Sequence, residues 1–174
     1  RRNRQFLPRS ALDQLIQLLS RQGYTVIGPT IVDDVVSMRE ITSADQLPRG
    51  IKDEQDGGKY HLTKGDDSLT FEFVVGPDGV KRHLFPPSLR LMQFHIRDDR
   101  FELDSGPPQV PKLAFLGIRP CELAALKVQD RVFGKGDPAG FRCESDPWYQ
   151  QAREESIYVA VNCTRPGGTC FCNS

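Results

Sequence analysis

The apolar residues of 10–22 recur three and four positions apart, a spacing that predicts an amphipathic helix. Ser10 and Asp13 fit the Ser-x-x-Asp form of a capping box at its start, and Gly23 is suited to end it. The apolar stripe on this helix would consist of Leu12, Leu15, Ile16 and Leu19. Such a stripe is expected to pack on a sheet formed by later segments.

Short runs of β-branched and aromatic residues predict mostly antiparallel strands as far as residue 104. A hairpin is expected over 30–41, with its turn at Asp33-Asp34. Polar residues over 49–58 predict a loop, and the prolines of 105–111 predict a linker. The other expected strands are 24–28, 60–62, 69–75, 90–96 and 100–104.

Beyond the linker the pattern changes to continuous apolar runs at 113–116 and 157–161, typical of strands covered on both faces. Pro120 suits the first position of a helix that continues to Phe133. Strand, helix and strand in this order predict a βαβ-like unit with parallel strands. The expected fold class is therefore α/β in a mixed α+β form. An N-terminal α+β region (1–111) and a cysteine-bearing region (112–174) would together make one compact domain.

The cysteines cluster after the two predicted buried strands. Cys121 follows the first strand, while Cys163, Cys170 and Cys172 follow the second, 41 residues further along. Because parallel strands end at the same edge of a sheet, the four thiols are expected to meet there. Four converging thiolates suit an iron–sulfur cluster or zinc better than a disulfide framework. The fifth cysteine, Cys143, lies in an irregular stretch and is interpreted as a non-ligand, or as the substitute if one of the four fails to converge.

Charged residues near these cysteines add two expectations. Cys121 would sit in the first turn of a helix, where the dipole lowers a thiol pKa. Arg119 and Arg165 lie close in sequence to the predicted ligands, and their charge would stabilise an anionic cluster. Each of them is equally consistent with an ordinary surface charge.

Charge, hydropathy and cysteine spacing exclude some classes of protein but do not decide which metal, if any, the cysteines bind. The 174 residues carry 23 basic and 23 acidic side chains, so no global charge attracts nucleic acid or an anionic membrane. No apolar stretch reaches the ~20 residues of a membrane span and no signal peptide is visible, which predicts a cytoplasmic protein with reduced thiols. The cysteine spacing fits neither zinc fingers nor bacterial ferredoxins. From the residues alone, cluster, zinc and free thiols all stay open.

Several motifs nevertheless resemble one family. The chain is similar to the β subunit of soluble nickel–iron sulfhydrogenases and to the A subunit of anaerobic sulfite reductase. The matching segments are 117–122 (Gly-Ile-Arg-Pro-Cys-Glu), 146–149 (Asp-Pro-Trp-Tyr), 161–163 (Val-Asn-Cys), 170–172 (Cys-Phe-Cys), and, in the N-terminal half, 24–29, 45–48, 58–62 and 81–87.

The resemblance implies an electron-transfer subunit rather than a stand-alone enzyme. Electrons would pass between a flavin-containing diaphorase subunit and a catalytic hydrogenase or sulfite reductase subunit. It further implies a 4Fe-4S cluster on the four cysteines, and a ferredoxin-like domain expected beyond residue 174.

Two rival functions remain. A structural zinc-binding or subunit-docking domain would use the same cysteines without redox activity. A thiol enzyme with Cys121 as nucleophile would need a nearby base, and His61, His83 and His95 all lie in the other half of the chain.

Overall fold

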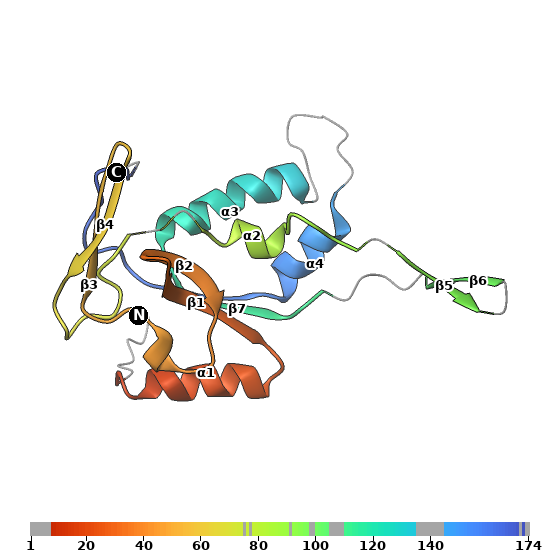
Figure 1. The fold of residues 1–174 in the computed structure, drawn as a ribbon, viewed down its shortest axis with the longest axis horizontal. Helices are drawn as coiled ribbons and strands as arrows, with labels where there is room; N and C mark the ends of the chain where they lie inside the picture. The colour runs from red at the N-terminus through yellow and green to blue at the C-terminus, as the bar shows by residue number, and fades with distance from the viewer. Residues whose placement is uncertain are drawn as a thin grey trace, which may run out of the picture.

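The computed structural model describes residues 8–74, 76, 78–90, 92–97, 100–104, 110–134, 145–170 and 172. They form a mixed α+β fold, as the sequence predicts (Figure 1). The elements in chain order are α1 (Ala11–Arg21), β1 (Thr25–Val32), β2 (Val35–Glu40), the 3-10 helix η1 (Ala44–Gln46), β3 (Ile51–Asp56), β4 (Lys59–Lys64), α2 (Lys81–Leu84), β5 (Gln93–Arg97), β6 (Arg100–Asp104), β7 (Leu113–Ile118), α3 (Pro120–Phe133), α4 (Pro147–Glu155) and β8 (Ile157–Ala160). No helix among the described residues is both long and apolar enough to cross a membrane.

The central sheet has the strand order β2-β1-β7-β8. β1 and β2 form the predicted antiparallel hairpin, and Asp33 and Asp34 both take positive φ in its turn. β7 runs parallel to β1 on one side and to β8 on the other, so the expected βαβ-like unit is present. Since β1 and β2 come from 1–111 and β7 and β8 from 112–174, the two regions share one sheet.

The core lies on both faces of β7, in which every residue is buried. Successive side chains of a strand point to opposite faces, so Phe115 and Leu116 enter different clusters. Phe115 packs with residues of α2, α3 and α4, including Leu84, Leu126 and Tyr149. Leu116 packs with the apolar stripe of α1. The result is three layers, with α1 on one face of the sheet and α2, α3 and α4 on the other (Figure 1).

Three local predictions are wrong: the capping box at the start of α1, the loop over 49–58 and the strand over 69–75. The Ser10–Asp13 capping box is absent, because the Asp13 carboxylate instead accepts hydrogen bonds from the Ala44 N–H (3.0 Å) and from Gln17 (2.7 Å). The polar segment predicted as a loop contains β3, which pairs in register with β4.

The segment 69–75 is no strand in its described part, residues 69–74. Leu69 forms backbone hydrogen bonds with Gly50 and Asp66, whereas several backbone groups from Phe71 to Val74 bond to side chains rather than to a neighbouring strand. The Val74 N–H donates to the buried carboxylate of Asp53 at 2.8 Å, and the carbonyls of Phe71 and Phe73 accept from Arg119. The alternating sequence pattern therefore packs Phe73 and Val74 into the core without forming a ladder.

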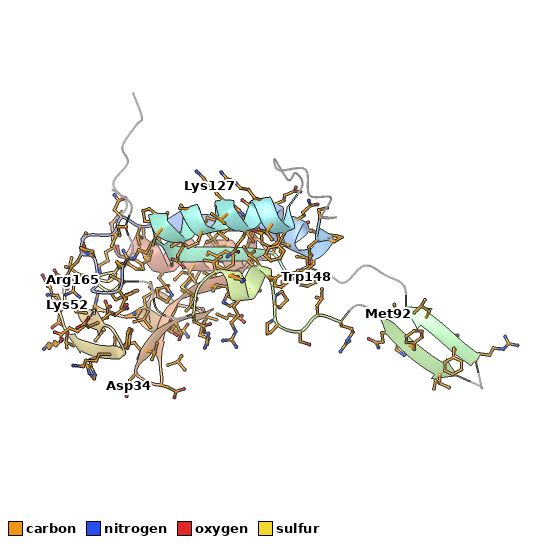
Figure 2. The ribbon with its side chains drawn as sticks, turned by 90° about the horizontal axis from the view of Figure 1, so that it is seen from above. Asp34, Lys52, Met92, Lys127, Trp148 and Arg165 are labelled. Carbon is orange, nitrogen blue, oxygen red and sulfur yellow. The ribbon has the colours of Figure 1, made fainter. Side chains whose placement is uncertain are left out.

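Two hairpins lie outside the central sheet. β3–β4 stands at the end of the molecule where the chain finishes, and β5–β6 projects from the opposite end (Figures 1 and 2). The turn expected at Asp98-Asp99 and most of the expected linker, 105–109, lie outside the described residues.

Candidate functional site

All four cysteines that the sequence singles out line one pocket of ≈ 250 Å³. Cys121 is on the first turn of α3, just after β7, and the other three follow β8. The parallel pairing of β7 with β8 brings these distant segments together, with the Val161 N–H donating to the Ile118 carbonyl at 2.8 Å. The rest of the wall is formed by Gln55, Val74, Arg119, Pro120 and Thr169. Cys143 lies outside the described residues.

The thiols surround this pocket without meeting at one point. All four are free and exposed, and no group of three or more His, Cys, Asp or Glu in the described part of the chain is placed to hold a single metal ion. Their role as metal ligands therefore stays a prediction. What the structure provides is four cysteines that line a common pocket, not a finished tetrahedral site.

The C-terminal segment is fastened to β3. The Thr169 hydroxyl donates to the Gln55 side chain at 2.5 Å, and Arg165 donates to the Asp53 carbonyl. Gly168 lies so close to β3 that a Cβ atom there would stand 2.2 Å from the Gln55 carbonyl oxygen. Only glycine permits this approach, which places Cys170 beside the pocket.

Within the same segment the sulfurs already take part in hydrogen bonds. The Gly167 N–H donates to the Cys170 Sγ at 3.1 Å, and the Cys163 thiol donates to the Arg165 carbonyl at 3.1 Å. A backbone N–H directed at a sulfur stabilises a thiolate and is one of the ways in which proteins tune cluster potentials. Cys170 thus already accepts one such hydrogen bond.

Arg119 is a buried clamp rather than a surface charge, with only 2% of its surface exposed. Its guanidinium donates to the carbonyls of Phe71 (2.7 Å), Phe73 and Asn162 (3.1 Å), and lies over the Phe73 ring. It joins the end of β7, the irregular segment 71–73 and the segment that carries Cys163. Burial lowers its pKa, although an arginine remains charged in proteins.

Arg165 is the second positively charged residue near the pocket, and it forms an ion pair with Asp53. Its guanidinium lies 3.8 Å from the Asp53 carboxylate, which is almost completely buried. One carboxylate oxygen of Asp53 accepts from the Val74 N–H, whereas the other has no hydrogen-bond partner. Arg165 therefore offsets a buried negative charge on β3, and Arg119 is the cation that lines the pocket itself. Figure 2 shows Arg165 at the same end of the molecule as Lys52 of β3.

The expected lowering of the Cys121 pKa by the helix dipole is wrong for this arrangement. Although Cys121 is exposed as a residue, partial desolvation of its thiol raises the pKa, and the neighbouring Glu122 carboxylate raises it further. Burial also raises the pKa of Glu122, whose carboxylate accepts from the Arg119 N–H at 3.0 Å. Desolvation here outweighs the favourable field of one helix end. A metal ion would displace the thiol proton on binding.

Sequence reasoning missed Asp53, Gln55 and Glu122. Glu122 had a visible signal, because a glutamate two positions after a helix-starting proline often accepts from the capping backbone N–H. Asp53 and Gln55 lay in a segment that looked like a polar loop, and no local pattern marks either of them. None of the three histidines lines the pocket, and His83 instead packs edge-on against Phe115 and lies 3.3 Å from the Met38 carbonyl.

Comparisons with known proteins add no relative to this description. No protein-family model, curated protein or solved structure matches the chain. The similarity to hydrogenase and sulfite reductase subunits therefore stays a prediction from the motifs.

Proposed function

We propose that this chain is an electron-transfer component of a multi-subunit oxidoreductase, with a 4Fe-4S cluster held by Cys121, Cys163, Cys170 and Cys172. The observation that supports the proposal most strongly is the pocket that these four residues line together. Such a cluster, when bound, accepts and releases single electrons, so the chain itself needs no acid or base.

The shape of the pocket favours a cluster over a single zinc ion. A tetrahedral zinc site draws four sulfurs to about 2.3 Å from one point and encloses no space. Here the four cysteines, together with five other residues, line a space of ≈ 250 Å³, whereas one water molecule occupies about 30 Å³ in the liquid. A group of several atoms bridging the four thiolates suits this space better than one ion does.

The remaining residues of the pocket have supporting roles. Val74 and Pro120 cover part of the wall with apolar surface, which limits the access of water. Arg119 adds a buried positive charge that would offset the negative charge of four thiolates, as proposed for it from the sequence. The same charge, fixed by three carbonyls, would hold the Cys121 and Cys163 segments at a constant separation.

The partners proposed for such a subunit follow from the motif resemblance. They are a flavin-containing diaphorase subunit on one side and a catalytic hydrogenase or sulfite reductase subunit on the other, in the cytoplasm. The alternative is a structural zinc-binding or subunit-docking domain, which would use the same cysteines without redox change.

The test is metal analysis of the chain purified without oxygen, together with its visible spectrum. We expect about four irons and a matching amount of sulfide per chain, with broad absorbance near ~400 nm that dithionite bleaches. Single Cys→Ser substitutions at the four positions should each remove most of the absorbance, and Cys143→Ser is the matched control that should retain it. Zinc without colour would refute the redox function and favour the structural alternative.

A further inference from the structure

The β5–β6 hairpin carries a row of large apolar side chains that the described part of the chain leaves uncovered. Phe101 is 76% exposed and Ile96 70% exposed, and the other members of the row are more than half exposed. The row consists of Met92, Phe94, Ile96, Phe101 and Leu103, and we call it the hairpin face. It does not involve the cysteine pocket.

The pairing register puts the row on one side of the hairpin. Phe94 lies opposite Leu103, and Ile96 lies opposite Phe101. Directly paired residues of an antiparallel ladder share a face, so these four side chains form one apolar surface. The other face carries the polar residues Gln93, His95 and Glu102.

A hairpin of this kind is incomplete by itself. Two antiparallel strands alone are marginally stable in water, and they need an apolar face packed against something else. The hairpin projects away from the body of the molecule in both views, beyond α2 and α4 (Figures 1 and 2). Its hairpin face is therefore available to another molecule.

We propose that the hairpin face packs against the same face of a second copy of this chain, in a dimer with twofold symmetry. Such an isologous contact needs a surface that complements itself, and this apolar row contains no charge that a copy would repel. Two such hairpins stacked face to face form a small four-stranded sandwich, in which each copy covers the row of the other.

The available area agrees with a dimer. The exposed fractions of the five side chains add up to about three whole side chains, or roughly 550 Å² at about 175 Å² each. Two copies would then bury about 1,100 Å² in total, which passes the ~1,000 Å² expected of a specific interface. Pairing of the hairpins edge to edge would leave Phe101 and Ile96 exposed, so the face is the better contact.

The proposal goes beyond electron transfer and does not depend on it. The hairpin and the C-terminal segment lie at opposite ends of the molecule, so a dimer formed through the hairpins leaves the pocket accessible (Figure 1). Iron content and dimer formation can therefore be measured separately, and loss of one leaves the other unaffected.

The experiment measures the mass of the full chain by light scattering from ~1 to ~100 μM, a range in which weak standard interfaces associate. A reducing agent is present throughout, because the exposed cysteines could otherwise link two chains. We expect the mass to rise with concentration from 19.6 kDa towards twice that value. A wild-type chain that stays monomeric over this range overturns the proposal, as does a monomer that binds lipid vesicles of phosphatidylcholine through the hairpin.

Substitutions then locate the contact. Phe101→Glu and Ile96→Glu should each raise the dimer dissociation constant by on the order of 30-fold, the effect of losing a central apolar contact. Gln93→Glu adds the same charge on the polar face of the hairpin and should leave the dimer intact. Circular dichroism checks that each variant is folded. A dimer that survives both face substitutions, or that Gln93→Glu disrupts equally, would place the contact elsewhere and overturn the proposal.

Discussion

Replacing Arg119 with methionine keeps an unbranched stem but removes the guanidinium group, and with it the clamp beneath the cysteine pocket. The substitution deletes three hydrogen bonds from a charged donor to the carbonyls of Phe71, Phe73 and Asn162. It leaves the buried Phe73 carbonyl and the acceptors of two partly buried hydrogen bonds without their donor at the point where three separate segments meet. We expect the free energy of unfolding to fall markedly, because these hydrogen bonds are lost and a buried side chain becomes shorter.

Two opposing contributions set the size of the effect. Each hydrogen bond from a charged group is worth about 1.5–3 kcal/mol, so three of them represent roughly 4–9 kcal/mol. Burial of the guanidinium, which lowers the Arg119 pKa, is unfavourable by several kcal/mol and is relieved by the substitution. The net loss should be about 3 kcal/mol, near the lower end of the range for breaking a buried charge interaction. For a domain of this size that corresponds to a melting temperature lower by about 6–12 °C.

Urea unfolding followed by circular dichroism and by tryptophan fluorescence measures this change. Trp148 is the only tryptophan and lies on α4, so its emission reports on the helical layer (Figure 2). Arg131→Met, at the exposed end of the same α3 helix, is the matched control and should change stability little. A loss below ~1 kcal/mol for Arg119→Met would refute the clamp, because solvent would then have to replace the arginine without cost.

Two further predictions concern pH and the C-terminal segment. Burial lowers the pKa of His83 below its ordinary 6.5, so the unfolded chain binds the proton first. The stability that a neutral His83 contributes is complete above about pH 6.5 and is lost as the pH falls below that value. Between about pH 7 and pH 5, the free energy of unfolding measured in urea titrations should therefore fall more for the wild type than for His83→Gln. Gly168→Ala directs a Cβ at the Gln55 carbonyl, so it should lower the iron bound per chain while changing the melting temperature little. Gly57→Ala places its Cβ in open space and should leave both the iron content and the melting temperature unchanged. Normal iron binding in Gly168→Ala would show that this close approach does not position the ligands.

The strand and helix patterns of the sequence were sufficient for the central layer. The continuous apolar runs around Phe115 and Tyr158 predicted parallel strands covered on both faces, and both runs do form parallel strands. The prediction of full burial is confirmed for β7 but is wrong for β8, which lies at the edge of the sheet and is only partly buried. The same logic fails at 69–75, where the alternating sequence predicts a strand and the described residues form none. The side chains of Asp53 and Arg119 satisfy backbone groups there instead, and these partners are 21 and 46 residues away from the groups they bond. Local periodicity contains no information about them.

For the candidate site, too, some features could be predicted from the sequence and others could not. The meeting of Cys121 with the C-terminal cysteines could be predicted, because it follows from strand order and direction alone. The direction of the Cys121 pKa shift could not be predicted, because it depends on how far the fold removes the thiol from water and on the nearby Glu122 carboxylate. The burial of Arg119 was equally hidden, since an arginine before a proline looks the same in sequence whether it faces water or three carbonyls.

The two halves of the pocket differ in how firmly the fold holds them. Cys121 follows a strand that is buried at every position, and Arg119 beside it is fixed by three carbonyls. Cys170 and Cys172 lie on an exposed segment that side-chain contacts fasten to β3. Under the proposed function the four thiols, which do not converge on one point here, would have to come closer together around the bound group. Part of the binding free energy would then be used to change the contacts between the C-terminal segment and β3, which couples metal affinity to those contacts as well as to the cysteines.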